Sequence, residues 1–318
     1  MPLLSRRETL TGLGALALGG CSPQPRPGSE PLVSILRAPG YTQDLYDSVR
    51  RLLLEHRLDV RGKRILLKPN LVEFDPSTTI NTHVLLVHAA LEAFRSLGAS
   101  AVQIAEGPGH RRLTLDLADA AGYFETIPGF EGVFTDLNLD EVRQVKLARP
   151  FSKLRSLFLP QTALACDLLV SMPKMKTHHW VGATLAMKNL FGLVPGAVYG
   201  WPKNILHWAG IHECIADLHR TFPSHFSIVD GIVGMEGNGP VQGTPKPAGV
   251  IVAGRDPAAV DATCCRIMGL DPAKIHYLKL AETRDQTREE CVRQIGEAIA
   301  GVRTPFDLIP QLRWVGAS

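Results

Sequence analysis

A short apolar segment between residues 171 and 195 carries many basic side chains. Its lysines are Lys174, Lys176 and Lys188, and its histidines include His178. An unpaired charge that is removed from water costs several kcal/mol, so these cations require an anionic partner. Either the fold or a ligand must supply that partner. The segment is therefore the predicted place of the protein's chemistry.

Lys174 and Lys176 alternate along the chain, and His178 continues the alternation. On an extended segment such side chains point to one face. Clustered cations attract a carboxylate or a phosphate and lower each other's pKa. A lysine tuned in this way can act as a base, or form a Schiff base with a carbonyl. These three residues and Lys188 are the predicted catalytic residues. The alternative is an ion pair with a carboxylate on a neighbouring strand.

Other polar residues are expected to bind the ligand. Lys68 and Asn70 follow the apolar run 65–67, and Glu106 follows the run 101–105. Asn189 stands next to Lys188. In open α/β sheets, ligands bind beyond the carboxyl ends of the strands. These side chains are therefore predicted to share one crevice with the lysines.

A block of carboxylates and glycines follows the apolar run 226–229. It contains Asp230, Glu236, Gly237 and Gly239. Carboxylates beside flexible backbone can bind a hard divalent cation such as Mg²⁺ or Ca²⁺. They can equally be the counter-ions of the lysines. The sequence leaves both roles open for Asp230 and Glu236, and the two glycines are assigned to ligand binding.

Several other classes of site are not indicated. The six cysteines form no Cys-x-x-Cys pair, so no iron–sulfur cluster is expected. His212-Glu213 is not followed by the second histidine of a His-Glu-x-x-His zinc motif. The chain has 34 basic and 31 acidic residues, and this near-neutral balance argues against nucleic-acid binding.

Strands and helices alternate along the chain, which predicts an α/β fold with a mainly parallel sheet flanked by helices. Asn81 or Thr82 is expected to cap a helix over 84–97, and Asp256 one over 257–268. The less regular stretch 131–160 is expected to form an antiparallel excursion or subdomain. The expected strands are 32–36, 65–68, 101–105, 168–171, 226–229 and 250–253, and further helices are expected at 41–54 and 182–190.

The first residues resemble an export signal. Arg6-Arg7 precedes an apolar run that ends in Leu-Gly-Gly-Cys. This order is typical of a twin-arginine signal peptide over 1–20 with a lipobox, in which Cys21 is lipidated. Residues 21–30, rich in proline, form the predicted tether, and 31–318 form one globular domain. We expect an exported protein, anchored by lipid on the periplasmic side of a bacterial membrane.

Several sequence blocks together resemble the domain-of-unknown-function 362 family. The resemblance covers roughly residues 32 to 275 and implies the α/β fold and the site, without naming a reaction. Some members carry ferredoxin-like clusters, for which this chain has no cysteine motif. The blocks are Lys-Pro-Asn-Leu at 68–71, Pro-Lys-Met-Lys-Thr-His at 173–178, Met-Lys-Asn-Leu-Phe-Gly at 187–192, Asp-Gly at 230–231 with Met-Glu-Gly-Asn-Gly-Pro at 235–240, and Asp-Pro at 256–257 with Val-Asp-Ala at 260–262.

The leading hypothesis is an exported, lipid-anchored enzyme that acts on a small anionic substrate or cofactor. The alternative is a non-catalytic lipoprotein that binds an anion or a metal ion. A catalyst needs a group that titrates near the working pH. A binder needs only permanent charge, for which arginine serves better than lysine. The basic blocks carry lysine rather than arginine, which favours the enzyme.

Overall fold

The computed structural model describes residues 30–110, 113–223, 225–281 and 285–317. The predictions for the signal peptide, for Cys21 and for nearly all of the tether lie outside these residues. Within the described ranges, no helix is long and apolar enough to cross a membrane.

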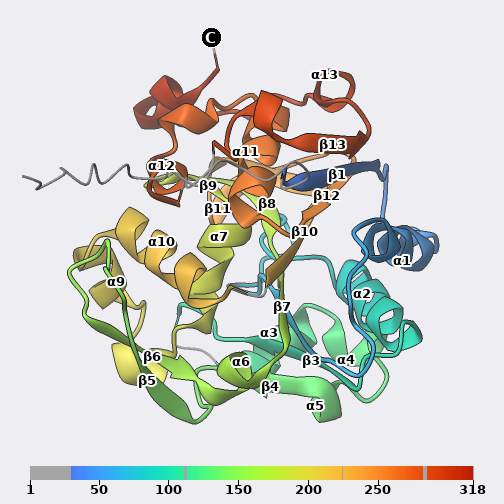
Figure 1. Ribbon diagram of the computed structural model, residues 1–318, viewed down its shortest axis with the longest axis vertical. Coiled ribbons are helices and arrows are strands. Elements are labelled where there is room, and N and C mark those ends of the chain that lie inside the picture. The colour runs from blue at the N-terminus through green and yellow to red at the C-terminus, as the bar shows by residue number, and fades with distance from the viewer. Residues whose placement is uncertain (1–29, 111–112, 224, 282–284, 318) are drawn as a thin grey trace, which may run out of the picture.

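A large, mostly parallel sheet runs through the molecule (Figure 1). Its strands follow the order β13-β1-β12-β10-β7-β2-β3-β4; β8 and β11 also pair with β10, and β9 pairs with β8. The neighbours from β10 through β7, β2 and β3 to β4 are parallel. Strand β12 runs antiparallel to both of its neighbours, β1 and β10. The predicted α/β class with a mainly parallel sheet is confirmed.

The strands of this sheet are β1 (Leu32–Arg37), β2 (Arg64–Pro69), β3 (Ala101–Glu106), β4 (Phe134–Asp136), β7 (Leu168–Met172), β8 (Lys174–His178), β9 (Gly182–Thr184), β10 (His225–Asn238), β11 (Gln242–Lys246), β12 (Val250–Gly254) and β13 (Arg293–Gly296). The helices are α1 (Leu45–Glu55), α2 (Val84–Ser96), α3 (Thr114–Ala120), α4 (Tyr123–Thr126), α5 (Phe130–Val133), α6 (Gln161–Ala165), α7 (Ala186–Asn189), α8 (Gly196–Tyr199), α9 (Asn204–Trp208), α10 (Ile211–Thr221), α11 (Pro257–Ile267), α12 (His276–Ala281) and α13 (Ile299–Val302), with 3₁₀ turns η1 (Leu190–Leu193), η2 (Pro272–Lys274), η3 (Glu289–Cys291) and η4 (Pro310–Val315).

Apolar side chains cover both faces of the sheet. Along β2, Ile65 and Leu67 pack into one core, which α1 and α2 complete. Leu66, between them, packs into the other core with α7, α10 and α11. Figure 1 shows these two groups of helices on opposite sides of the strands. Because both faces of the sheet are buried, the parallel strands appear in the sequence as continuous apolar runs.

The antiparallel excursion expected near 131–160 is confirmed by a two-stranded sheet. It consists of β5 (Val142–Lys146) and β6 (Ser156–Pro160), which pair in antiparallel register. The predicted cap of α11 is also confirmed, since the Asp256 side chain accepts from the backbone N–H groups of Ala258 and Ala259.

The predicted cap of α2 is wrong. Its N-cap is His83, whose ring accepts from the Leu85 N–H. The Thr82 hydroxyl instead donates to the Met172 carbonyl and accepts from Asn70 N, and Asn81 bonds the backbone of Val72. Short polar side chains before a helix can brace a loop as well as cap the helix, and here they fix the loop that follows β2.

The helix predicted over 182–190 is only partly present. Residues 182–184 form β9, which pairs with β8, and α7 begins at Ala186. Gly182 has a φ of +85°, which breaks a helix at that point. The buried Asp261 carboxylate accepts from the N–H groups of Ala186 and Met187, at 2.8 and 3.1 Å, and so fixes the start of α7. Lys188 and Asn189 therefore sit on one short, capped turn.

Candidate functional site

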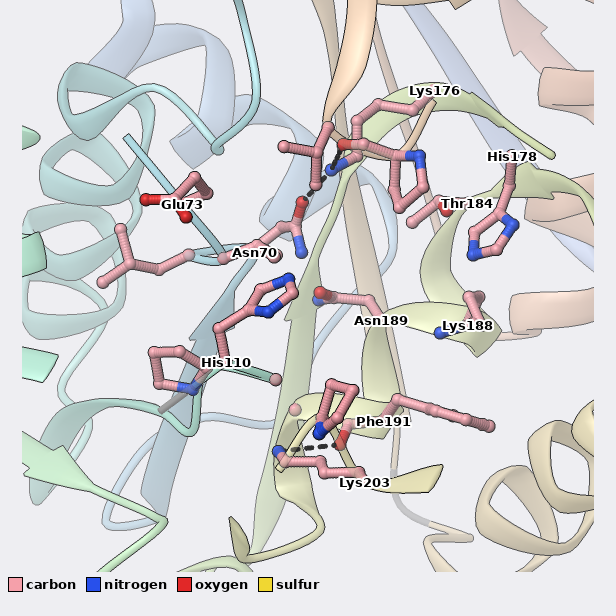
Figure 2. Close-up of a pocket in the computed structure, with 18 of the residues that line it drawn as sticks. Asn70, Glu73, His110, Lys176, His178, Thr184, Lys188, Asn189, Phe191 and Lys203 are labelled. Carbon is pink, nitrogen blue, oxygen red and sulfur yellow. Dashed lines mark hydrogen bonds between the residues drawn. The ribbon is translucent and has the colours of Figure 1, made fainter. Parts of the chain in front are cut away.

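A cavity of about 540 Å³ opens beyond the carboxyl ends of β2 and β3. Helix α7, the turn after β10 and the segment before α9 complete its wall. Figure 2 shows Lys176 at the top of this cavity, Lys188 at the right and Lys203 at the bottom. Lys68 lines it as well, so four lysines face one space.

Lys68 is paired with a carboxylate. Its Nζ lies 2.5 Å from Glu106 Oε2, and both side chains are buried. The same Nζ donates to the Pro69 carbonyl and to Asn189 Oδ1, at 3.0 and 3.3 Å. Burial lowers the pKa of Lys68, and the Glu106 charge opposes that shift. A Cβ on Gly192 would collide with Glu106 and Lys68, so glycine at this position makes room for the pair.

Lys176 is held by neutral oxygens. Its Nζ donates to Asn70 Oδ1 at 2.7 Å, to the Ile80 carbonyl at 2.9 Å and to the Pro240 carbonyl at 3.1 Å. Burial lowers its pKa far below the usual range, and the charges of Lys174 and Lys188 add to that effect. The three acceptors use all three hydrogens of the ammonium group.

Lys188 differs from the other cavity lysines in its contacts. Its Nζ lies 3.8 Å from the centre of the Phe191 ring. Within the described ranges, it makes no hydrogen bond or ion pair. Burial, followed by the charge of Lys68, lowers the pKa of Lys188 to about 7. Its side chain is half-buried and reaches the cavity (Figure 2).

Lys203 is a cavity residue that the sequence did not indicate. Its Nζ donates to the Gly107 carbonyl at 2.7 Å and to the Phe191 carbonyl at 3.4 Å. Burial lowers its pKa to about 7. It follows a Trp-Pro pair in a loop between two short helices, with a φ of +67°. A lone lysine in a loop resembles any solvated residue, so no signal in the sequence pointed to it.

Histidines form another part of the wall. His178 Nδ1 accepts from the Trp180 N–H at 3.1 Å, which assigns the ring proton to Nε2. Burial and the nearby Lys188 charge lower the pKa of His178 well below its usual range, so the ring is neutral. His179 Nδ1 bonds the Gly239 carbonyl at 2.7 Å. The wall also contains His110 and His207, which the sequence did not single out.

Lys174 and Asp230 do not line this cavity, so the expectation that they share it is wrong. Lys174 Nζ lies 2.7 Å from Asp230 Oδ2, and both side chains are fully buried. Tyr41 donates to Asp230 Oδ1 and accepts from Lys174, and the backbone N–H of His83 donates to Asp230 Oδ2. This is the ion pair that stood as the alternative reading. It borders a separate cavity of about 260 Å³.

Glu236, Gly237 and Gly239 also lie outside the wall of the large cavity. Glu236 pairs with Lys246 at 2.9 Å and accepts from the Asp307 N–H. Gly237 lies near the end of β10 with a φ of +81°, and Gly239 lies in the turn that follows the strand. Their neighbours Asn238 and Pro240 line the cavity instead.

The metal site predicted from Asp230 and Glu236 does not fit the structure. Each carboxylate already has a lysine partner, and the two lysines belong to different strands, β8 and β11. Among the described residues, no group of three or more His, Cys, Asp or Glu side chains could hold a metal ion. Of the residues assigned from the sequence, Lys68, Asn70, Glu106, Lys176, His178, Lys188 and Asn189 do come together.

Comparison with known proteins shows which sequences and structures this chain resembles. The thylakoid-associated protein sll1697 of Synechocystis sp. is 29% identical over 261 residues, which cover 79% of this chain and 78% of that protein. The lactate racemase apoprotein of Thermoanaerobacterium thermosaccharolyticum aligns at a TM-score of 0.47 with 14% identity, and a Thermotoga maritima protein at 0.38 with 11%. These alignments cover 75% and 70% of this chain and 57% of each of those structures. The model of the domain of unknown function DUF362 matches residues 65–266, well over half of the chain, and the protein therefore belongs to the DUF362 family.

Proposed function

We propose that the protein is an enzyme that binds a small anionic substrate in the large cavity. One observation carries this proposal. Four lysines face the same space, and among the described residues only Lys68 has a carboxylate in direct contact. When Lys188 and Lys203 are protonated, they add positive charge that no carboxylate of the described residues contacts. A carboxylate or phosphate group would complete charge-assisted hydrogen bonds with these two lysines, whose hydrogens the fold does not all use.

The titration of these lysines favours catalysis over simple capture. Lys188 and Lys203 each have a pKa of about 7, whereas an ordinary lysine stays charged up to about pH 10.5. General acid–base catalysis needs groups that change protonation near the working pH. A site built only for binding would be served better by permanent charges. We assign the reactive role to Lys188, because its amine is the least held by the fold.

Anion binding and protonation are coupled in this proposal. A bound anion raises the pKa of neighbouring lysines. At pH 8 the lysines that are mostly neutral in the free protein would therefore take up protons as the anion binds. The apparent affinity should fall as the pH rises above 7, since the free protein then loses the charge that attracts the ligand.

The test is calorimetric titration with inorganic phosphate and with acetate, at pH 6.5, 8 and 9 and constant ionic strength. We expect binding that weakens with pH, and at pH 8 a heat that depends on the buffer and reports proton uptake. Lys188→Met and Lys203→Met should each reduce the uptake. Lys63→Met is the matched control, because Lys63 is exposed and precedes β2, at the opposite end of that strand from the cavity. If neither anion binds at any of these pH values, the proposal fails. If anions bind without any proton uptake, the non-catalytic binder replaces the enzyme.

The location of the protein is a second part of the proposal. The Arg6-Arg7 pair, the apolar run and the lipobox at Cys21 support twin-arginine export and lipid anchoring on the periplasmic side. The name of the Synechocystis relative puts that protein at a membrane system. Fractionation tests this directly, since Cys21→Ser should move the protein from the membrane fraction to the soluble fraction. A variant that stays at the membrane would contradict the anchor.

A further inference from the structure

We propose that Lys188 is a nucleophile that forms an imine with a small 2-oxo acid bound in the large cavity. This inference rests on the proposed anion-binding function and names its substrate class. The observations that carry it are the contacts of the four cavity lysines and the position of His178.

Three of the four lysines are held by acceptors. An ammonium group has three hydrogens. Lys68 donates to three oxygens, among them the Glu106 carboxylate, and Lys176 donates to three others. Each of these amines already directs its hydrogens to three fixed oxygens, so neither is placed to turn a lone pair towards a substrate carbonyl. Lys203 donates to two backbone carbonyls.

Lys188 is the exception among these lysines. Its Nζ packs on the Phe191 ring at 3.8 Å and has no hydrogen-bond acceptor among the described residues. It stands on the capped turn α7, so its backbone is fixed while its amine is free. With a pKa of about 7, roughly half of the molecules carry a neutral Lys188 at pH 7, because a group at its pKa is half ionised. Neutral amine is the form that attacks a carbonyl.

The surroundings of Lys188 suit a substrate with a carbonyl next to a carboxylate. Lys176 and Lys203 provide positive charge above and below it for the carboxylate (Figure 2). His178 lies on the same side of the cavity, and its ring proton is on Nε2. A neutral imidazole N–H can donate a hydrogen bond to the carbonyl oxygen and polarise it. The rings of Phe191 and Trp180 line the same cavity and offer apolar surface for a short side chain.

The step is balanced without a further reactant. The Nζ lone pair forms a bond to the carbonyl carbon of the oxo acid, and the carbon–oxygen π electrons move to the oxygen. The two hydrogens of the neutral amine leave with that oxygen as one molecule of water. The product is a carbon–nitrogen double bond between Lys188 and the substrate.

Reductive trapping tests the inference. The full chain is incubated with pyruvate and sodium cyanoborohydride at pH 7, digested, and mapped by mass spectrometry. We expect a reduced pyruvate adduct on Lys188, at least about tenfold more abundant than on the exposed Lys63, because an ordinary lysine is almost entirely protonated at this pH. The adduct should increase from pH 6 to pH 7.5, whereas phosphate binding weakens as the pH rises above 7.

The controls separate this inference from the function on which it rests. Lys188→Arg keeps the charge and should still bind phosphate, but should lose the adduct. If that variant does not fold, mapping of the wild type alone identifies the modified lysine. If pyruvate binds but leaves no adduct, or if the adduct falls on Lys203 or is spread over exposed lysines, the imine at Lys188 is wrong and the anion site stands. If neither pyruvate nor phosphate binds, the proposed function fails first.

Discussion

Lys174 and Lys176 lie two residues apart on the same strand, and both are completely buried, yet their surroundings are opposite. Lys174 contacts the Asp230 carboxylate at 2.7 Å. Lys176 contacts only an amide and two carbonyl oxygens, and it faces the large cavity. The fold gives Lys174 a carboxylate partner, whereas it holds Lys176 with neutral oxygens beside the cavity.

The difference originates in β10, the strand beside them. Asp230 is paired with Lys174, but Met235 is paired with Lys176, because the register shifts between these two positions. Five residues of β10 thus match two residues of β8. A regular ladder would have paired Lys176 with Ile232, whereas the shift pairs it with Met235, three residues further along β10 and so further from Asp230. A change in backbone register can therefore turn one of two equivalent lysines into a site residue.

The largest expected effect comes from breaking the paired lysine. Lys174→Met leaves the Asp230 carboxylate buried without its cation, which should lower the free energy of unfolding by about 3–5 kcal/mol. Lys176→Met leaves three neutral oxygens without a donor but also removes a like charge, so we expect a loss of only about 1–2 kcal/mol. Urea denaturation of both variants at pH 7 measures the difference.

A double variant provides the control for this pair. In Lys174→Met with Asp230→Asn the buried negative charge is gone, and most of the lost stability should return. The comparison between the two lysines would be wrong if Lys176→Met unfolded the protein as readily as Lys174→Met. Phosphate binding adds a second readout, because it should weaken strongly in Lys176→Met and little in Lys174→Met.

The sequence could predict the elements around these lysines but not their partners. The continuous apolar runs of β2 and β7 and the spacing of α2 and α11 follow from local periodicity, which the chain shows plainly. The alternation of Lys174 and Lys176 fits the extended strand β8, but no strand was predicted there. The register shift in β10 depends on packing between segments more than 50 residues apart. For that reason the sequence could not tell which lysine would meet Asp230.

The same limit explains the residues that were missed. Lys203 lines the cavity from just before α9 and His207 lines it from α9 itself, and such short elements give no periodic signal. His178 and Lys188 were found because they lie beside other polar residues in an apolar segment. Glu236 was assigned to the site because it follows an apolar run, but β10 continues as far as Asn238, and on this strand Glu236 pairs with Lys246 outside the cavity wall.

Gly192 offers a test of the second paired lysine. Its backbone lies against the Lys68–Glu106 pair, and a Cβ there would collide with both side chains. Gly192→Ala should therefore cost about 3 kcal/mol of stability, in the upper part of the range for overpacking. Gly132→Ala is the matched control, since nothing lies within 4 Å of a Cβ at that position. Equal melting temperatures for the two variants would show that the pair adjusts freely.

The unpaired lysines predict an effect of pH on stability. Lys203 has a pKa of about 7 in the folded protein and 10.5 in the unfolded chain. Between these values the unfolded chain binds more protons, so the free energy of unfolding rises with pH. The cost of burying the charge is fully present below pH 7 and is relieved towards pH 10.5. Between pH 7 and 8.5 the gain should be about 2 kcal/mol, at about 1.4 kcal/mol per pH unit.

The Lys203→Met variant isolates this contribution. Burial raises the pKa of Asp261 to about 8, and that shift makes stability fall with pH up to about 8. The Asp261 contribution is the same in the wild type and in the variant. Any difference between the two proteins in how the free energy of unfolding changes from pH 7 to pH 8.5 is therefore due to Lys203. If the two proteins respond to pH in the same way, Lys203 is charged throughout and does not titrate near 7.

The smallest effect is expected at Glu236, a carboxylate on the same strand as Asp230. Its ion pair with Lys246 is partly exposed, with side chains 12% and 26% accessible. Such pairs contribute about 1 kcal/mol or less. In Glu236→Gln the amide oxygen can still accept from Asp307 N, so unfolding should change little and phosphate binding should not change.

Glu236→Gln also tests whether this carboxylate holds a metal. If it does, Mg²⁺ or Ca²⁺ should raise the melting temperature of the wild type but not that of the variant. We expect both proteins to respond to these ions equally, because Lys246 and the Asp307 N–H already occupy the carboxylate. A response to these ions in the wild type alone would show that Glu236, on the β10–β11 hairpin, belongs to a functional site after all. It would also show that the degree of burial of an ion pair does not tell which of the two β10 carboxylates, Asp230 or Glu236, is structural and which is functional.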